Sequence, residues 1–353
     1  MTNKIVPIRF VDNKLVLLDQ RKLFLKEEDF ICSSLEDVYF AIKDMVVRGA
    51  PAIGVSAAYG MYLKALSLED FGHADFISEM KKAGAYLNTA RPTAVNLSYA
   101  INEMLGVLDV SSMPNNISNR DDVLKLLWDK ALDIHKEDEE ANKRIGENML
   151  SLLKDSKSIL TVCNAGILAT TAYGTATSAF YLAKEKERPL KVYACETRPR
   201  LQGARLTAYE LHKNDIDVTV ITDGMVAHLM ANNMVDGVIA GCDRVASNGD
   251  TANKIGTQNI SIIAKRFNIP FYIACPTSTI DMNIEDGSQI VIEERDRDEV
   301  AFIDNIPIVP LGVKVFNPAF DVTDHKDITA IVTERGILRP DYTKSIKEIM
   351  RKI

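Results

Sequence analysis

Two short polar stretches of this chain each follow an apolar run, and together they contain a thiol and a carboxylate. The first is Cys-Asn-Ala-Gly at residues 163–166, and the second is residues 241–257, which include Asp243. Each apolar run predicts a buried strand, and a helical pattern follows each polar stretch. In an open α/β sheet, ligands bind at the carboxyl ends of strands, beside helix N-termini. Cys163 and Asp243 are therefore candidates for one active site.

Cysteines recur near the ends of the predicted strands, at Cys163, Cys195, Cys242 and Cys275. A small, soft side chain packs well in such places, and for any one of these cysteines packing is the favoured interpretation. Only Cys163 is followed at once by a potential helix cap, Asn164, and then by a glycine two residues further on. A helix N-terminus at this point would favour the thiolate.

Arg48, Gly49 and Ala50 stand where one helical pattern ends and the next begins. The two small residues allow a ligand to approach the backbone, the guanidinium offers a bidentate fork, and Pro51 suits a first helical turn. This is phosphate-binding chemistry, although a tight turn between helices explains the residues equally well. Arg91, between two further helical patterns, is a second candidate, and there a solvent-facing turn arginine is the favoured interpretation.

Three arginines, Arg198, Arg200 and Arg205, fall within eight residues after the predicted strand that ends near Cys195. Clustered guanidinium groups at a strand-to-helix junction indicate contacts with an anion or a carboxylate. An internal network of salt bridges with Glu196 and Glu210 accounts for them equally well.

The polar run after the fourth predicted strand contains a turn at residues 248–250 and then a helix expected to begin near Asn253. Asn253 and Lys254 would project from the first turn of that helix, where an anion is favoured. Asp243 sits just past the strand. An ion pair with its neighbour Arg244 is the structural alternative to a catalytic role.

The elements that must position these residues change in character along the chain. Up to about residue 125 we predict a small, mostly helical domain with a short β region, which contains a hairpin over residues 5–18 and a helix that starts at Ser34. Residues 121–154 predict a long connecting helix or a pair of helices.

After residue 155, apolar strand-like runs alternate with helical patterns. The runs lie at 158–163, 190–196, 217–222, 236–242, 269–275 and 289–293. Such alternation predicts βαβ units and a parallel sheet. The predicted fold class is thus α/β, with an N-terminal domain over residues 1–125 and a catalytic domain over residues 126–353.

Composition excludes several classes of function. A net charge of −7 over 353 residues argues against general attraction to nucleic acid. The N-terminus does not have the pattern of a signal peptide, and no apolar stretch approaches the length of a membrane span. Five cysteines without paired short spacing suit a reducing cytoplasm. The sequence contains neither a metal-binding motif nor a lone GxGxxG fingerprint, so we expect no metal and no cofactor.

Taken together, the motifs resemble the methylthioribose-1-phosphate isomerase family. That family is related to the regulatory subunits of translation initiation factor 2B and includes 5-deoxyribose-1-phosphate isomerases. The similarity covers nearly the whole chain. It is carried by residues 17–20, 46–54, 163–166, 196–199, 241–244, 253–257, 317–323 and 333–336. The resemblance implies a mostly helical N-terminal domain, a Rossmann-like catalytic domain and a homodimer.

The resemblance also implies roles for individual residues. Cys163 and Asp243 match the catalytic pair of such isomerases. The positions that hold the substrate match Arg48, Gly49, Ala50, Arg91, Gln202, Asn253 and Lys254.

The implied reaction converts S-methyl-5-thioribose 1-phosphate, a sugar of methionine salvage, into the ketose S-methyl-5-thioribulose 1-phosphate. The phosphate on the anomeric carbon prevents spontaneous ring opening, so the enzyme must protonate the ring oxygen. This task suits Asp243 as a general acid in a water-poor pocket. Hydrogen then moves from C2 to C1, either through an enediol with Cys163 as base or as a hydride shift. Neither route needs a nicotinamide or a metal.

One departure from the family pattern affects the substrate. Many members have His directly before the catalytic cysteine, whereas this chain has Val162. A branched apolar residue dries the surroundings of the thiol and removes a proton partner. 5-Deoxyribose 1-phosphate, which lacks the methylthio group, fits the same catalytic residues. The remaining alternatives are a non-catalytic regulatory subunit and a ribose-1,5-bisphosphate isomerase.

Overall fold

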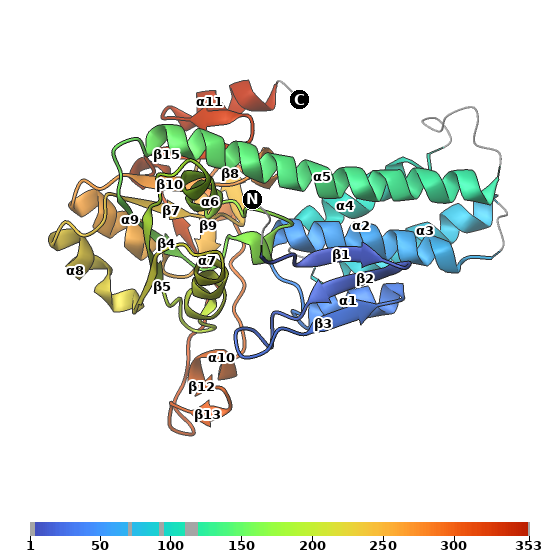
Figure 1. The fold of residues 1–353 in the computed structure, drawn as a ribbon, viewed down its shortest axis with the longest axis horizontal. Coiled ribbons are helices and arrows are strands. Elements are labelled where there is room, and N and C mark those ends of the chain that lie inside the picture. The colour runs from blue at the N-terminus through green and yellow to red at the C-terminus, as the bar shows by residue number, and fades with distance from the viewer. Residues whose placement is uncertain (1–3, 70–72, 92–94, 110–118, 352–353) are drawn as a thin grey trace. The chain divides into compact units, whose positions relative to one another are not determined.

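The computed structural model describes residues 4–69, 73–91, 95–109 and 119–351 (Figure 1). The chain divides into two compact units. The N-terminal unit contains residues 3–140 and 167–174, and the C-terminal unit contains residues 141–166 and 175–353. The division therefore falls inside one long helix, α5 (Arg120–Leu152). The domain boundary at residue 125 stays a prediction.

The N-terminal unit combines a small antiparallel sheet with a group of helices. The strands are β1 (Ile8–Val11), β2 (Lys14–Leu18) and β3 (Asp29–Cys32), and the helices are α1 (Leu35–Lys43), α2 (Ala50–Ser67), α3 (His73–Asn88), α4 (Val95–Gly106) and the first part of α5. The predicted hairpin is confirmed by the pairing of β1 with β2. The predicted helix start is also confirmed, because Ser34 and Asp37 form a capping box at α1.

The C-terminal unit is built on a seven-stranded sheet with the order β16-β15-β10-β7-β4-β5-β6. These strands are β4 (Ser158–Val162), β5 (Lys191–Cys195), β6 (Val218–Ile221), β7 (Gly237–Ala240), β10 (Phe271–Ala274), β15 (Ala330–Thr333) and β16 (Gly336–Leu338). All neighbours are parallel except β15 and β16. The prediction of an α/β fold with a parallel sheet is confirmed.

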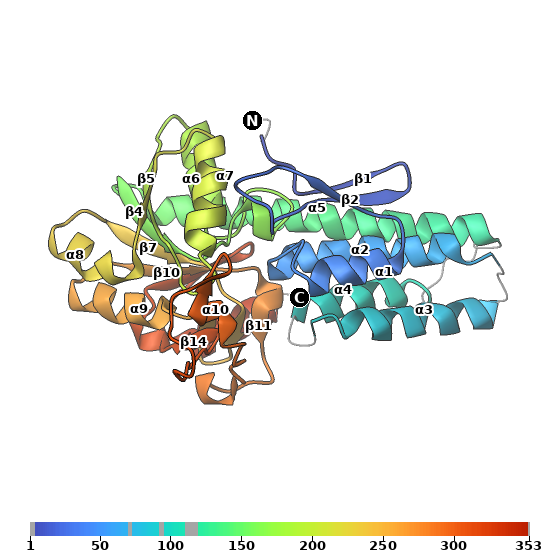
Figure 2. The same ribbon diagram turned by 90° about the horizontal axis from the view of Figure 1, so that it is seen from below.

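Helices cover both faces of this sheet (Figure 2). They are α6 (Ser178–Glu185) and α7 (Ala208–Lys213) on one face, and α8 (Val226–Ala231) and α9 (Thr257–Arg266) on the other; α11 (Tyr342–Met350) follows β16. A strand between two helical layers is hidden from water on both sides. The apolar residues of β4 and β7 accordingly lie in the core. Within the described ranges, no helix is both long and apolar enough to cross a membrane.

A second sheet of the C-terminal unit has the order β11-β8-β9-β14. Its strands are β8 (Arg244–Ala246), β9 (Thr251–Lys254), β11 (Ile280–Asp281) and β14 (Phe320–Thr323). The helix predicted to begin near Asn253 is therefore wrong, because this residue lies on β9 and α9 begins only at Thr257. The strand forms because it pairs with β14, more than sixty residues further along the chain.

Five of the six predicted strands of the C-terminal unit are confirmed, and the run at 289–293 is not a strand. Residues 287–289 form a 3₁₀ turn, and Val291 is 91% exposed. An apolar run becomes a strand only where a neighbouring backbone can pair with it. Here the nearest pairing is a single bridge between Glu294 and Pro318.

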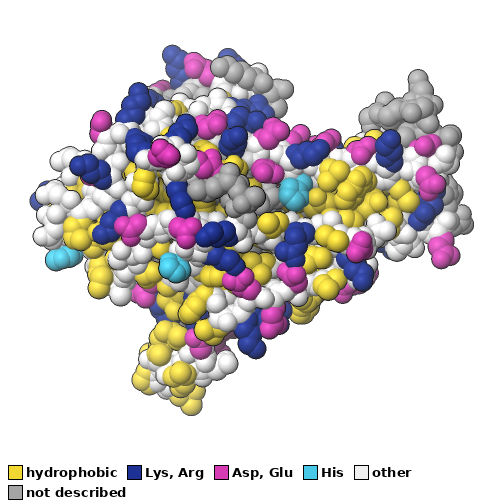
Figure 3. All heavy atoms as spheres, viewed as in Figure 1, with side chains coloured by type: hydrophobic (Ala, Val, Ile, Leu, Met, Phe, Trp, Pro, Cys, Tyr) yellow, Lys and Arg dark blue, Asp and Glu magenta, His cyan; other side chains and the backbone are white. Residues whose placement is uncertain are grey.

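A short arm of the C-terminal unit consists of α10 (Asp298–Ala301), β12 (Phe302–Ile303) and β13 (Ile306–Pro307). It projects from the seven-stranded sheet in Figure 1, and apolar side chains gather at its tip in Figure 3. Ile306 is 65% exposed and Leu311 is 99% exposed.

Candidate active site

The seven-stranded sheet has its topological switch point between β4 and β7. From β4 the chain adds β5 and β6 in one direction and then β7 and β10 in the other. Val162 and Ala240, the last residues of β4 and β7, are partners in the parallel ladder. Cys163 follows the first strand directly, and Asp243 lies three residues past the second. Ligands of open α/β sheets bind in the crevice at such a point, so both candidate catalytic residues occupy the expected edge.

The backbone of Cys163 is held in the left-handed region, with φ of 63°. Its N–H donates to Thr197 Oγ1 at 2.8 Å, and its carbonyl accepts from Thr207 Oγ1 at 2.6 Å. The predicted helix directly after Cys163 is wrong. A 3₁₀ turn lies at Ile167–Ala169, and α6 begins only at Ser178. The loop that begins at Cys163 is therefore held by two threonine hydroxyls, one on the N–H and one on the carbonyl of Cys163, and not by a helix N-terminus.

Behind this loop lies a buried carboxylate, Glu210, whose side chain is fully enclosed. The amide of Asn164 donates to Glu210 Oε2 at 3.2 Å and to Thr207 Oγ1 at 3.1 Å. A Cβ on Gly166 would lie 1.5 Å from Glu210 Oε1, so any larger residue there would displace the buried carboxyl group. Burial and the nearby Glu210 raise the pKa of Tyr181. The Cys163 loop is thus hydrogen-bonded to a buried carboxyl group.

Asp243 is an exposed residue, and its N–H donates to Ala252 O at 2.9 Å, which ties the strand end to β9. Its neighbour Arg244 lies 3.5 Å from Asp281 Oδ2. The thiol of Cys242 donates to Arg244 O at 3.0 Å. The residues on either side of Asp243 are therefore engaged within the fold.

Asn253 and Lys254 are buried on β9, where they pair with Asp321 and Phe320 of β14. The ammonium of Lys254 donates to Ala319 O at 3.0 Å and lies 4.3 Å from the centre of the Phe320 ring. Burial lowers the pKa of Lys254, and the nearby charges of Cys163 and Asp243 oppose that effect. The lysine therefore shares one electrostatic environment with both candidate catalytic residues.

Gln202 is buried and precedes a π-helical turn at Gly203–Thr207, which leads into α7. Its Oε1 has no hydrogen-bond partner within the described parts of the chain. π-Helical turns are frequent at functional sites, and a buried, unsatisfied carbonyl is costly. A ligand hydroxyl is the kind of group that would satisfy it.

The arginines around Gln202 make contacts within the fold. Arg200 lies 2.7 Å from Glu299, and Arg205 lies 2.6 Å from Asp304. Arg198 donates to the carbonyl of Val300 at 2.8 Å. The interpretation as internal ion pairs is therefore the better one, although the partners are residues of the projecting arm instead of Glu196 and Glu210.

The remaining candidates for substrate contact lie in the N-terminal unit. Arg48, Gly49 and Ala50 form the entry to α2, and all three are partly exposed. Gly49 has φ of +88°, and a Cβ there would lie 2.3 Å from the carbonyl oxygen of Ala169. Only glycine fits, and it leaves the first N–H groups of the helix open to an anion. Arg91 is partly exposed and lies just after α3. The residues that follow it, 92–94, lie outside the described ranges.

Sequence reasoning missed Arg295, which lies near Lys254. The side chain of Arg295 is 9% exposed, and its guanidinium lies 5.6 Å from the Phe320 ring. It adds positive charge that lowers the pKa of Lys254. The residues around Arg295 carry no periodic signal. Arg295 is held close to β14 by its N–H, which donates to Asn317 O at 2.9 Å, and this contact has no local sequence pattern.

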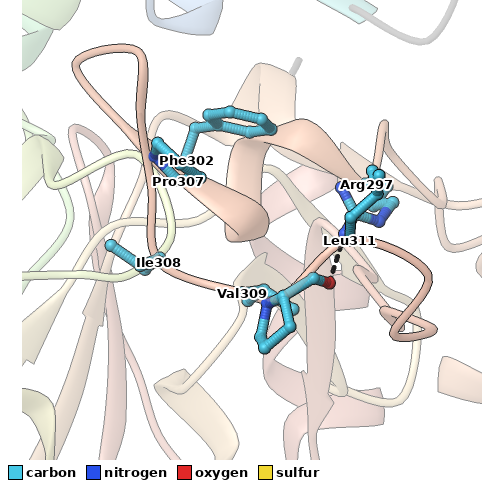
Figure 4. Close-up of a pocket in the computed structure, with 7 residues that line it drawn as sticks. Arg297, Phe302, Pro307, Ile308, Val309 and Leu311 are labelled. Atoms are coloured by element: carbon cyan, nitrogen blue, oxygen red, sulfur yellow. Dashed lines mark hydrogen bonds between the residues drawn. The ribbon is translucent and has the colours of Figure 1, made fainter.

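A hollow of about 550 Å³ lies on the projecting arm (Figure 4). Its lining is apolar apart from Arg297, which donates to the carbonyl of Pro310 at 3.4 Å. The lining includes neither a carboxylate nor a thiol. This hollow therefore offers no side chain for acid–base catalysis.

A parallel sheet with polar residues at its switch point defines an α/β ligand-binding protein. A family model described as the initiation factor 2 subunit family matches residues 46–340, and the chain belongs to that family.

Two relatives are similar over nearly the full length. The 5-deoxyribose 1-phosphate isomerase of Clostridium botulinum (strain Kyoto / Type A2) is 51% identical over 99% of both chains. The 5-methylthioribose 1-phosphate isomerase of Pyrococcus horikoshii OT3 superposes with a TM-score of 0.93 at 37% identity and covers 99% of this chain and 97% of its own. A second solved structure, translation initiation factor eIF-2B subunit delta from A. fulgidus, has a TM-score of 0.88 at 41% identity. The match covers 99% of this chain and 100% of that chain.

Proposed function

We propose that this chain is an aldose–ketose isomerase of sugar 1-phosphates, with 5-deoxyribose 1-phosphate as its preferred substrate. The observation that carries the proposal is the placement of Cys163 and Asp243 after the two strands that flank the switch point. The electrostatic environment that they share with the buried Lys254 supports it. The isomerase activities of the relatives from Clostridium botulinum and Pyrococcus horikoshii support it further.

In the proposed reaction, Asp243 gives a proton to the ring oxygen as the bond between this oxygen and C1 breaks. The hydrogen on C2 moves to C1. As C2 becomes a carbonyl, the 2-hydroxyl releases its proton to solvent, from which Asp243 is protonated again. No oxidant is required, because one carbon is reduced and its neighbour is oxidised. Cys163 either takes the C2 proton or stabilises the charge of a hydride shift. Since Asp243 is exposed, the sugar itself must exclude water from the carboxylic acid.

The remaining contacts divide between phosphate and sugar. Arg48, Gly49 and Ala50 offer a guanidinium fork and free N–H groups to the phosphate, and Arg91 adds a second positive charge. Gln202, Asn253 and Lys254 provide polar groups for the sugar hydroxyls. The unsatisfied Oε1 of Gln202 would accept a hydrogen bond from one of these hydroxyls.

The preference for the deoxy sugar rests on the relatives and on Val162. The relatives that are 50–51% identical act on 5-deoxyribose 1-phosphate. Val162 is buried directly before the catalytic thiol and supplies no proton partner. S-Methyl-5-thioribose 1-phosphate is the second candidate substrate.

A regulatory, non-catalytic subunit is the alternative from another class, because the eIF-2B subunit delta from A. fulgidus is 41% identical. We also propose that the chain acts in the cytoplasm as a homodimer, as the resemblance implies. Light scattering of the purified protein measures that state directly, and a monomer at micromolar concentration would contradict the dimer.

The test is proton NMR of the purified protein with each of the two sugars in heavy water. We expect ketose from both, with the larger kcat/KM for 5-deoxyribose 1-phosphate. Solvent deuterium at C1 would favour the enediol over the hydride shift. If neither sugar is converted, the isomerase proposal fails and the regulatory subunit becomes the better reading.

A further inference from the structure

We infer that Thr197 and Thr207 are positioning residues that hold the candidate catalytic Cys163 in its left-handed conformation. The inference rests on the proposed function for its kinetic consequence, and on the geometry alone for its structural one. Both threonines are buried, at 1% and 0% exposure. Thr197 lies two residues after β5, and Thr207 ends the π-helical turn before α7. Two separate elements therefore contact Cys163.

The two hydroxyls contact both backbone polar groups of Cys163. Thr197 Oγ1 accepts from the Cys163 N–H at 2.8 Å, and Thr207 Oγ1 donates to the Cys163 carbonyl at 2.6 Å. A residue other than glycine rarely has φ near +60°, and Cys163 has it where surrounding contacts enforce it. The two threonines are the contacts that enforce it here.

Each hydroxyl is also fixed in direction. Thr197 Oγ1 donates to the carbonyl of Cys195 at 3.0 Å, so its lone pair faces Cys163. Thr207 Oγ1 accepts from Asn164 Nδ2 at 3.1 Å, so its proton faces the Cys163 carbonyl. Because each hydroxyl is used once as donor and once as acceptor, a methyl group of the same size cannot replace it.

The hydroxyls of Thr197 and Thr207 form a clamp on the backbone of Cys163, and each threonine is also held by the surrounding fold. The N–H of Thr197 donates to Asp223 Oδ1 at 2.9 Å, and Thr207 belongs to the same helical segment as Gln202 and Glu210. One segment therefore carries a candidate substrate contact, one half of the clamp and the buried carboxylate beneath the loop. A shift of this segment would move the thiol of Cys163 and the side-chain amide of Gln202 together.

The test compares Thr197→Val and Thr207→Val, which remove the hydroxyls, with Thr197→Ser and Thr207→Ser, which keep them. Thr219→Val on exposed β6 is the matched control. We expect each clamp valine variant to lower kcat about 100-fold at nearly constant KM, because a misplaced reacting group loses rate more than binding. The serine variants and the control should stay within about 3-fold of the wild type. A valine variant with wild-type kcat, or with an altered KM alone, would overturn the inference.

A second readout does not depend on turnover. Iodoacetamide should alkylate Cys163, identified by peptide mass spectrometry, about 10-fold faster in the valine variants, since the loop is released, and serine should restore the wild-type rate. Equal rates in all variants would refute the clamp even if the enzyme is active. Changed rates in a protein that converts neither sugar would refute the function and leave the clamp standing.

If the valine variants do not fold, hydrogen exchange of the wild-type protein decides. The Cys163 amide should exchange at least about 100-fold more slowly than an unstructured amide, because its N–H is bonded to a buried hydroxyl. Exchange at the unstructured rate would contradict the inference.

Discussion

Cys163 and Cys195 come from the ends of β4 and β5, which are neighbours in the same parallel sheet. Cys195 is the last residue of its strand, fully buried, and burial strongly raises the pKa of its thiol. Cys163 lies one residue beyond its strand, partly exposed, with a left-handed backbone held by two threonine hydroxyls. The same residue type at the same edge therefore has a packing role in one case and a proposed chemical role in the other.

The difference shows that the strand end alone does not create a reactive site. A thiol inside the sheet is removed from water, and at Cys195 burial and the nearby Asp223 and Glu196 all raise the pKa, so the thiol remains protonated. One residue further, the chain leaves the ladder, and its side chain can face the crevice at the switch point. The residue after the strand, and the contacts that fix its backbone, make the difference.

The largest effect is expected at Asp243, and the two ends of β7 provide the comparison. Asp243→Asn should lower kcat by about 1,000-fold, because it removes the proposed general acid. Asp236, at the other end of this strand, accepts from the N–H groups of Lys157 and Ser158 at 2.7 and 2.9 Å. Asp236→Asn should cost about 1 kcal/mol of stability and leave kcat unchanged. Steady-state kinetics and urea unfolding of both variants measure these two effects. Equal losses of kcat in Asp243→Asn and Asp236→Asn would contradict a catalytic role limited to the carboxyl end of β7.

A smaller effect is expected at Lys254. Lys254→Met should raise KM by about 100-fold, because the variant lacks the positive charge beside the sugar phosphate. The same variant should be at least as stable as the wild type, since burial disfavours the ammonium and lowers its pKa. Lys265→Met, at an exposed lysine paired with Asp327, is the matched control and should change neither quantity. A wild-type KM for Lys254→Met would exclude the lysine from substrate binding.

The smallest effects concern two aspartates of the four-stranded sheet region with opposite pKa shifts. Asp250 accepts from Asn248, Gly287 and His325, and despite partial burial these hydrogen bonds lower its pKa to about 2. Burial raises the pKa of Asp321 to about 6, against two backbone hydrogen bonds from Gly256 and Gln258.

The two shifts predict opposite dependences of stability on pH. The Asp250 contribution is present above pH 3.8 and is lost as the pH falls toward about 2. The Asp321 contribution is present below pH 3.8 and is lost as the pH rises through about 6. Differences in unfolding free energy between wild type and Asp250→Asn or Asp321→Asn should therefore have opposite slopes. They should amount to about 1 kcal/mol for Asp250, after allowance for screening, and about 2 kcal/mol for Asp321. Slopes of the same sign would contradict the assignment.

Much of the fold follows from local pattern. The alternation of apolar runs with helical patterns indicated β4, β5, β6, β7 and β10. The signal is clearest for strands such as β7 and β10, which lie between helical layers and are buried throughout. The capping box at Ser34 gave the start of α1 for a similarly local reason.

The elements that local pattern missed depend on distant partners. β9 is a strand because of β14, so Asn253 and Lys254 are placed by pairing and not by a helix start. Cys163 is followed by a held loop because Thr197 and Thr207 reach it from other elements. The identities of the candidate site residues were accessible from sequence, whereas the contacts that fix Cys163 and Lys254 were not.

The decisive test compares the matched variants Cys163→Ser and Cys195→Ser. Proton NMR measures the rate at which each variant forms ketose from 5-deoxyribose 1-phosphate. We expect Cys163→Ser to lower kcat/KM by at least about 1,000-fold and Cys195→Ser to change it by less than about 5-fold, because only the first thiol is proposed to reach the substrate. Comparable rates for the two variants would contradict the central claim that the residue beyond β4 does the chemistry.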